Sequence, residues 1–167
     1  MTASRGRGHR IGLISDTHGL LRPYVFDALA GVEVILHAGD VGGDDILDGL
    51  ATIAPVHAVF GNTDPPGDPR LAASIDHVVD GVTIHVSHGH EVGAPTPERL
   101  LSRYDATVLV YGHTHRGLIE RHGVRLVVNP GAAGPRRFDL LPSVALLRVH
   151  GSSVEAELVS LADEGKE

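Results

Sequence analysis

Five polar motifs rich in histidine and aspartate recur along the chain, and each follows a short apolar run. Histidine, aspartate and asparagine side chains bind divalent ions of intermediate hardness, such as Mn²⁺, Fe²⁺, Zn²⁺ and Ni²⁺. The motifs supply seven candidate metal ligands: Asp16, His18, Asp40, Asn62, His88, His113 and His115. Seven ligands are too many for one tetrahedral site. They suit two ions that share a carboxylate, as in hydrolases with a two-metal centre.

The spacing within the motifs indicates how the ligands divide between two ions. In the motif DTH, the i, i+2 spacing lets Asp16 and His18 reach one ion from an extended backbone. In the motif GHTH the chain is leaving its strand, so His113 and His115 can serve neighbouring ions. His90 lies two residues beyond His88. It is a candidate for contacting the substrate or supporting a ligand, and a solvated side chain is the alternative.

The apolar runs before the motifs have the composition of buried strands. They are short, rich in valine and isoleucine, and end in glycine or a small polar residue. Strands that alternate with helices predict an α/β core, in which ligands bind beyond the carboxyl ends of the strands. All five motifs are therefore expected at the same edge of a sheet. The expected strands lie within residues 10–15, 32–39, 56–61, 82–89 and 106–112, and the expected helices near 23–30, 43–51 and 96–104.

The last third of the chain is predicted to form two hairpins that add antiparallel strands to the core. Residues 117–131 are expected to turn at His122-Gly123, and residues 143–161 near Gly151-Ser152. The proline- and glycine-rich stretch 64–70 is predicted to be a loop inside one domain. We expect a flexible tail over residues 1–10, a single domain over 11–161 and a second flexible tail over 162–167.

Composition excludes several classes of function. The formal net charge is −7 and the basic residues form no long cluster, which argues against a broad nucleic-acid-binding surface. Lys166 is the only lysine, so an anion must be bound by arginine, backbone amides or metal. No apolar run approaches the roughly 20 residues that span a bilayer, so no membrane partner is expected. The chain has no cysteine, which excludes disulfides and thiolate metal sites and favours a cytoplasmic location.

Taken in order, the motifs DTHG, GDV, GNTD, HGH and GHTH, followed by NPGA, resemble those of the calcineurin-like metallophosphoesterase superfamily. More narrowly, the chain resembles the small YfcE-like phosphodiesterases. Each motif alone is weak, whereas all five in this order at strand ends are specific. The resemblance spans residues 11 to about 150. It implies an α/β fold of the αββα type, a two-sheet β-sandwich flanked by helices.

The resemblance also implies a role for each ligand. Asp16, His18, Asp40 and His115 would hold the first ion, and Asp40 would bridge to a second ion held also by Asn62, His88 and His113. His88 and His90 would steady the phosphate as catalytic residues, with Asn62 and His90 in contact with the substrate. The expected cofactors are two divalent ions per chain, foremost Mn²⁺, with Fe²⁺, Zn²⁺ or Ni²⁺ as alternatives.

One residue departs from the pattern of the superfamily. The residue after the GN asparagine is often a histidine proposed to protonate the leaving group, and the small subfamily commonly has cysteine there; this chain has Thr63. The change leaves the ligands intact but puts general-acid catalysis in doubt.

Two other features have two interpretations each. Asp64 supports a ligand or belongs to a turn, and Arg136 with Arg137 clamps a phosphate or is solvated.

These observations predict a phosphodiesterase that hydrolyses phosphodiester bonds with a metal-bridging hydroxide at a dinuclear centre. The expected partners are a small phosphodiester substrate and, as an option, a second copy of the chain in a homo-oligomer. The alternative is a non-catalytic scaffold that keeps the fold, as a eukaryotic retromer subunit does with part of its ligand set changed. All seven ligand positions match here, which argues against that alternative. A nuclease would need a larger basic groove than this composition offers.

Overall fold

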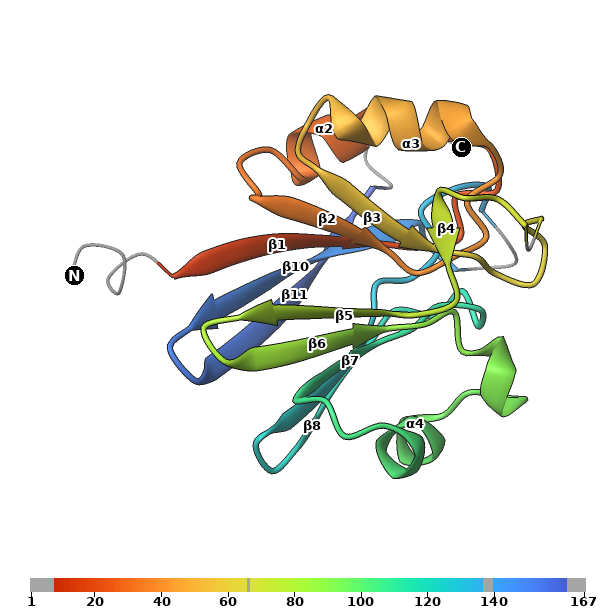
Figure 1. The fold of residues 1–167 in the computed structure, drawn as a ribbon. Coiled ribbons are helices and arrows are strands. Elements are labelled where there is room, and N and C mark those ends of the chain that lie inside the picture. The colour runs from red at the N-terminus through yellow and green to blue at the C-terminus, as the bar shows by residue number, and fades with distance from the viewer. Residues whose placement is uncertain (1–7, 66, 137–139, 162–167) are drawn as a thin grey trace.

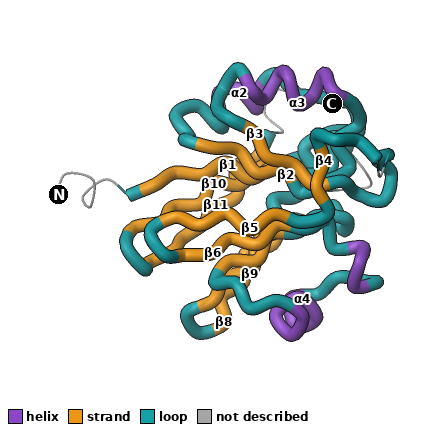
Figure 2. The backbone as a smooth tube through the Cα atoms, viewed as in Figure 1, coloured by secondary structure: helices purple, strands orange, loops and turns teal. Residues whose placement is uncertain are grey.

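The computed structural model describes residues 8–65, 67–136 and 140–161 of the chain. Two β-sheets stack face to face, with helices on their outer surfaces (Figures 1 and 2). The predicted α/β sandwich of two sheets flanked by helices is confirmed. One sheet contains, in spatial order, β11 (Ser153–Ser160), β10 (Ser143–His150), β1 (His9–Ile14), β2 (Val34–His37), β3 (Val56–Val59) and β4 (Leu71–Ala72). The other contains β5 (Ile75–Val79), β6 (Val82–Val86), β7 (Val108–Val110), β9 (Arg125–Asn129) and β8 (Leu118–His122).

The strands that carry the motifs divide between the two sheets, whereas the sequence pattern suggested one sheet edge. β1, β2 and β3 are parallel neighbours in the first sheet, and β6 and β7 are parallel neighbours in the second. Buried strands have similar compositions whichever sheet they join, because both of their faces pack against apolar neighbours. Stacking the sheets still brings the five carboxyl ends to one edge of the sandwich, which we call the site edge.

The three hairpin turns lie at the opposite edge, which we call the turn edge. The turns join β5 to β6 at 80–81, β8 to β9 at 123–124, and β10 to β11 at 151–152. The predicted hairpins near Gly123 and Gly151 are confirmed. β10 pairs antiparallel with β1 as expected, but β9 lies parallel to β7. The strand β5 was not among the predicted strands.

The core fills the space between the two sheets. Along β1, Ile11 and Leu13 point into this space, whereas Ile14 contributes to a second apolar cluster between the sheet and its helices. That cluster lies under α2 (Tyr24–Ala28) and α3 (Asp44–Ala51), and a third, smaller cluster lies between the second sheet and α4 (Pro97–Arg103). Strands buried on both faces explain why the apolar runs are continuous rather than alternating.

The helix predicted near residues 96–104 begins as its sequence indicates. The Thr96 hydroxyl accepts a hydrogen bond from the backbone N–H of Arg99 at 3.2 Å, and Pro97 occupies the first helical position. The helices predicted near 23–30 and 43–51 are also present, as α2 and α3. Among the residues described, no helix is long and apolar enough to cross a membrane.

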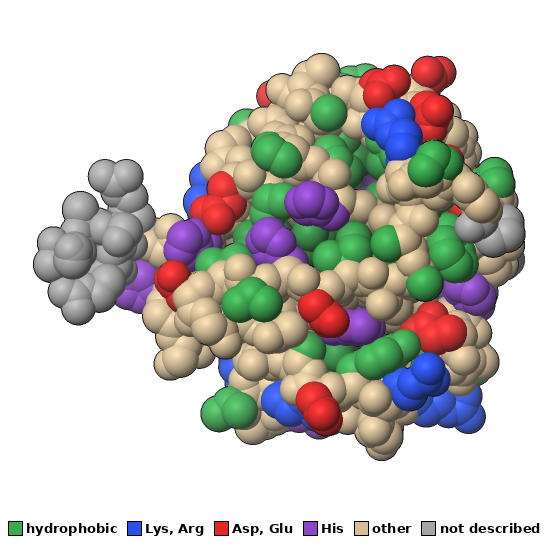
Figure 3. Space-filling view, viewed as in Figure 1, with side chains coloured by type: hydrophobic (Ala, Val, Ile, Leu, Met, Phe, Trp, Pro, Cys, Tyr) green, Lys and Arg blue, Asp and Glu red, His purple; other side chains and the backbone are tan. Residues whose placement is uncertain are grey.

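Parts of the predicted domain boundaries lie outside the described residues. β1 begins at His9, so the strand includes the last two residues of the predicted N-terminal tail. Residues 1–7 and 162–167 are not described, and the division into one domain with two tails stays a prediction. On the face shown in Figure 3, acidic and basic side chains are interspersed and form no continuous basic area.

Candidate metal centre

Backbone hydrogen bonds join the loops at the site edge to one another. The N–H groups of Asp16 and His18 donate to the carbonyls of Gly39 and Asp40, both at 2.9 Å, which ties the loop after β1 to the loop after β2. In the second sheet, the Gly112 N–H donates to the His88 carbonyl at 3.0 Å. The predicted ligands therefore lie on short loops that are held against each other.

Most of the predicted ligands have an unusual backbone conformation. Six described non-glycine residues have positive φ, and five of them are predicted ligands: Asp16, His18, Asp40, His113 and His115. The left-handed region is uncommon for residues with a Cβ atom, although aspartate and histidine tolerate it better than most. Asp16 and His18, with φ of 54° and 46°, do not lie on the extended backbone that the spacing of DTH suggested. Such strain gathers at functional sites, where the surrounding structure holds it in place.

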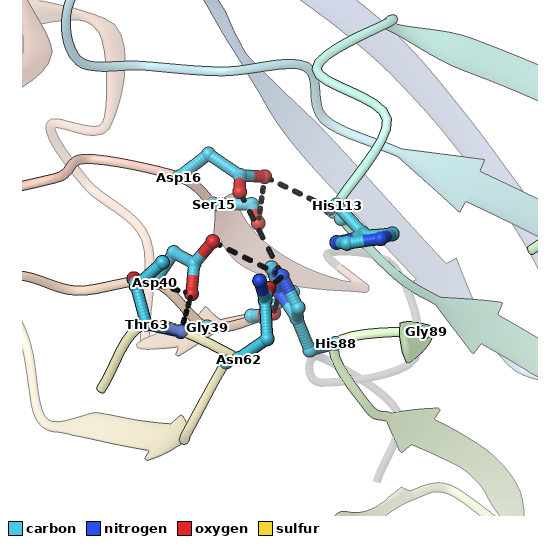
Figure 4. Close-up of polar contacts among 12 residues, drawn as sticks. Ser15, Asp16, Gly39, Asp40, Asn62, Thr63, His88, Gly89 and His113 are labelled. Atoms are coloured by element: carbon cyan, nitrogen blue, oxygen red, sulfur yellow. Dashed lines mark hydrogen bonds and ion pairs between the residues drawn. The ribbon is translucent and has the colours of Figure 1, made fainter. Parts of the chain in front are cut away.

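Asp16 connects the two sheets through one carboxylate oxygen, and its other oxygen accepts no hydrogen bond from the part of the chain that the structure describes. Its Oδ2 accepts a hydrogen bond from the Ser15 hydroxyl at 2.7 Å and another from the His113 N–H at 3.1 Å (Figure 4). Its Oδ1 is buried and has no hydrogen-bond partner among the described residues. An unpartnered buried carboxylate oxygen is costly unless a cation balances it. The donor set at this position therefore fits a metal ion.

Five of the seven predicted ligands form two compact groups. Asp16, His18 and His115 make one group, and Asp16, Asp40 and His88 make the other; within each group one ligand atom per residue lies within 4.8 Å of the others. Asp16 Oδ1 lies 3.4 Å from His115 Nε2 and 3.9 Å from His88 Nε2. Asp16 therefore faces both groups, as Asp40 does, and the assignment of the bridge to Asp40 alone stays a prediction.

Asp40 is buried and has its two carboxylate oxygens in different surroundings. Oδ1 accepts hydrogen bonds from the N–H and the hydroxyl of Thr63. Oδ2 lies 3.2 Å from His88 Nε2 and 3.6 Å from His18 Nε2. Burial alone would raise the pKa of Asp40, but its interactions with His88 and Thr63 outweigh burial and hold the pKa well below its usual range. Asp40 therefore carries a negative charge near neutral pH.

His88 is oriented by the carbonyl of Ala38. Because a carbonyl can only accept, Nδ1 of His88 carries a proton and donates to Ala38 at 2.8 Å, which directs Nε2 toward the two carboxylates. Burial works to lower the pKa of His88, but Asp40 and Asp16 outweigh it and raise the pKa. A cation bound here would take the place of the Nε2 proton.

Asn62 and His113 complete the second group less directly. The Asn62 amide oxygen lies 3.0 Å from His88 Nε2, on an exposed loop. The His113 ring lies edge-on to the His88 ring, with 5.1 Å between centroids. Burial, followed by the charge of His88, lowers the pKa of His113 and favours the neutral form that binds metal. The structure thus brings the Asn62 oxygen and the His113 ring beside His88 in the second group, and His113 itself belongs to neither compact group.

His90 lies next to the centre at the start of the short helix η1 (His90–Val92). Its ring centroid is 5.4 Å from that of His88 and 6.3 Å from that of His113. Glu91 holds this turn by accepting hydrogen bonds from the Gly89 N–H and the Tyr104 hydroxyl. His90 therefore lies beside His88 and His113 without belonging to either ligand group, and its contact with a substrate stays a prediction.

His37, at the end of β2, is a residue that the sequence did not single out. The Gly39 N–H donates to its Nδ1, so Nε2 carries the proton and donates to the Thr17 hydroxyl, which in turn donates to the Val41 carbonyl. Burial, only partly opposed by nearby carboxylates, lowers the pKa of His37 to about 4. This neutral histidine fixes the loop that carries Asp40. A single histidine closing an otherwise apolar strand was the signal for it.

Asp64 and Asn129 shape the loops around the centre. The Asp64 carboxylate accepts hydrogen bonds from the N–H groups of Val41, Gly42 and Gly61, so it joins the loops after β2 and β3. Asn129 accepts a hydrogen bond from the Gly131 N–H and donates one to the Gly112 carbonyl, so it joins the end of β9 to the loop after β7. Arg136 is exposed, and Arg137 lies outside the described residues.

A two-sheet sandwich with carboxylates and histidines gathered at one edge defines the architecture of the metallophosphoesterases. Residues 10–152 match the calcineurin-like phosphoesterase superfamily domain. The chain belongs to the calcineurin-like phosphoesterase superfamily, and the resemblance seen in the motifs is confirmed. The family implies divalent metal ions and the hydrolysis of phosphate esters.

Individual relatives agree with this family. A probable metallophosphoesterase of Methanothermobacter thermautotrophicus is 37% identical over 160 residues, which cover 89% of this chain and 91% of the relative. A phosphodiesterase of Methanocaldococcus jannaschii is 29% identical over 140 residues, covering 73% and 82%. Among solved structures, Vps29 of Entamoeba histolytica in complex with Zn²⁺ aligns with a TM-score of 0.76 and 27% identity, covering 91% of this chain and 99% of Vps29.

Proposed function

We propose that the chain is a metal-dependent phosphodiesterase with two divalent ions at the site edge. The single observation that carries the proposal is the pair of ligand groups that share Asp16, together with the buried and unpartnered Oδ1 of that residue. The similarity to a phosphodiesterase of M. jannaschii supports a diester substrate. Mn²⁺ is the ion we favour, with Fe²⁺, Zn²⁺ and Ni²⁺ as alternatives, because imidazole and carboxylate ligands together suit this class of ions.

The residues of the chain would hold the ions and the substrate in fixed positions. Asp16, His18, Asp40 and His115 would bind one ion, and Asp40, Asn62, His88 and His113 the other. When bound, the two ions would supply Lewis acidity and generate a hydroxide nucleophile from water near neutral pH. His90, beside the second group, would steady the phosphate, and Asn62 reaches the same side from its exposed loop.

Charge explains how a protein of net charge −7 would attract a phosphate ester. Two divalent ions outweigh the charges of Asp16, Asp40 and a hydroxide, which leaves a local surplus of about one positive charge. The lowered pKa of Asp40 keeps its carboxylate ionised near neutral pH, which favours binding of a cation. A small diester suits this protein better than a long nucleic acid, because the net charge is −7 and the basic residues form no long cluster in the sequence.

The test of this function is a series of phosphodiesters whose leaving groups differ in pKa. Thr63 is unsuited to protonate a leaving group near pH 7, so nitrophenyl diesters should react fast and rates should fall steeply as the leaving-group pKa rises. General-acid assistance is worth about 10²–10⁴-fold, which sets the size of the expected fall. The measurement is the rate against leaving-group pKa at fixed pH with saturating Mn²⁺.

Three outcomes of that series would each change a different part of the proposal. A nearly flat plot would show that another acid, such as His90, protonates the leaving group. Hydrolysis of phosphomonoesters alone would overturn the diester specificity. No hydrolysis of any ester with the ions bound would favour the scaffold alternative, in which the chain binds a partner through the same fold.

A further inference from the structure

Thr63 makes two hydrogen bonds to the same atom of the centre. Its backbone N–H and its hydroxyl both donate to Asp40 Oδ1, at 2.9 Å and 2.7 Å (Figure 4). The hydroxyl carries a single proton, and a carboxylate oxygen can only accept, so this proton lies between the two oxygens. Thr63 therefore uses its only hydroxyl proton on Asp40 and has none to offer a leaving group while this bond exists.

Because of these two hydrogen bonds, the two carboxylate oxygens of Asp40 have different surroundings. Oδ1 has two protein donors, whereas Oδ2 faces His88 Nε2 at 3.2 Å and His18 Nε2 at 3.6 Å, one histidine from each ligand group. A carboxylate held at one oxygen cannot rotate without breaking both bonds to Thr63. The bonds thus direct Oδ2 toward the place between the two groups.

Contacts of the neighbouring residues hold the loop around Thr63 in this arrangement. Asp64, the next residue, is buried and accepts from three backbone N–H groups, which fixes the position of Thr63 relative to the loop after β2. A Cβ atom on Gly61 would lie 2.1 Å from Asp40 Oδ1, so glycine is required for this approach. Thr63 itself is exposed, and no apolar core depends on its side chain.

We propose that Thr63 is a positioning residue, whose hydroxyl holds the Asp40 carboxylate so that Oδ2 is presented to the metal ions. This inference rests on the proposed function, because it assumes that Asp40 binds metal. It assigns a role to the position at which the superfamily often has a histidine. Thr63 acts on the ligand rather than on the leaving group.

The test is metal affinity, measured by titrating metal-free protein with Mn²⁺ in a calorimeter. Thr63→Val keeps the shape of the side chain and the backbone N–H bond but removes the hydroxyl. Residues that support a metal ligand typically contribute about 10–100-fold to affinity, so Thr63→Val should bind Mn²⁺ weaker by that factor. Thr63→Ser retains the hydroxyl and should stay close to the unmodified protein.

A matched control is Thr52→Val. Thr52 is also exposed, and its hydroxyl also donates one hydrogen bond, to the Gly49 carbonyl at the end of α3, remote from the site edge. Its replacement should leave Mn²⁺ affinity unchanged. Metal-free Thr63→Val should lose only the small stability contribution of one hydrogen bond and still unfold cooperatively, so a weaker Mn²⁺ affinity would reflect positioning and not loss of the fold.

Three results would overturn the inference in different ways. Unchanged affinity in Thr63→Val would show that the hydroxyl does not position Asp40. An equal loss in Thr63→Ser and Thr63→Val would assign the effect to the methyl group instead. Failure of the unmodified protein to bind Mn²⁺ would overturn the proposed metal centre itself, and is distinguishable because it appears before any variant is made.

Discussion

Glycine residues serve different purposes at the two edges of the sandwich. At the turn edge, Gly81, Gly123 and Gly151 have positive φ, and a Cβ atom on any of them would meet nothing within 4 Å. There, glycine serves the geometry of the turn. At the site edge, a Cβ atom on Gly112 would lie 2.0 Å from the Ser15 hydroxyl oxygen. There, glycine makes room for side chains of the centre.

Positive φ also has different causes at the two edges. Of the non-glycine residues described with positive φ, Asp80 alone belongs to a hairpin turn, and the other five lie at the site edge. A left-handed residue with a Cβ atom costs about 1–2 kcal/mol, so five together are a considerable strain. The hydrogen bonds between the loops hold them in place. The site edge is therefore specified by contacts between its loops, whereas the turn edge is specified by local turn chemistry.

The largest expected effect comes from Asp40→Asn, which removes a charge from the site edge. Loss of a residue that only supports a metal ligand costs about 10–100-fold. Asp40 is a proposed ligand, so turnover of Asp40→Asn should fall by more than about 100-fold. The control is His57→Ala in the upstream half of β3, where the side chain is exposed. It should alter stability at most. Initial rates with a nitrophenyl diester measure the activity of both variants. Equal losses of activity in Asp40→Asn and His57→Ala would contradict the assignment of the active site to the site edge.

A second prediction concerns the stability of the site edge against acid. The unfolded chain protonates His37 near pH 6.5, while the folded chain does so only near pH 4, because burial lowers its pKa. Folding stability should therefore fall as the pH decreases from 6.5 toward 4, by about 3 kcal/mol from this residue. His37→Asn keeps an acceptor for the Gly39 N–H and removes the titrating group. Urea denaturation at several pH values should show a flatter dependence in the variant; parallel curves would contradict the role of His37.

The smallest effects distinguish the two kinds of glycine. Gly112→Ala introduces an atom 2.0 Å from the Ser15 hydroxyl oxygen and 2.6 Å from Asp16 Oδ2, which should cost about 1–3 kcal/mol and weaken Mn²⁺ binding. Gly123→Ala meets no atom but keeps φ at +63°, so about 1 kcal/mol of backbone strain is expected with Mn²⁺ binding unchanged. Urea denaturation measures the stability of the two variants, and calorimetry measures their Mn²⁺ affinity. Loss of Mn²⁺ binding in both variants would remove the distinction between the edges.

Much of the fold could be predicted because its signals are local. The apolar runs predicted the strands that end at the site edge, Thr96 with Pro97 predicted the start of α4, and the glycines at 123 and 151 predicted two hairpins. β5 was missed because its exposed and half-buried positions alternate in a strand with only one partner. The division of strands between sheets was also missed, since it depends on contacts that no single run encodes.

The residues of the candidate site could be named from the sequence, but their supporting contacts could not. Asp16 and the His113 N–H are 97 residues apart, and Thr63 and Asp40 are 23 apart. Such pairs meet only when the loops of the site edge are in place. For the same reason, an extended backbone was expected for Asp16 and His18, whereas the neighbouring loop holds both in the left-handed region.

The proposed metal centre is tested most directly by the metal content of protein purified without chelator, measured together with hydrolysis of a nitrophenyl phosphodiester. We expect two divalent ions per chain, loss of hydrolysis after exhaustive chelation, and a fuller recovery with Mn²⁺ than with Mg²⁺. Unchanged hydrolysis by metal-free protein would contradict the proposed centre.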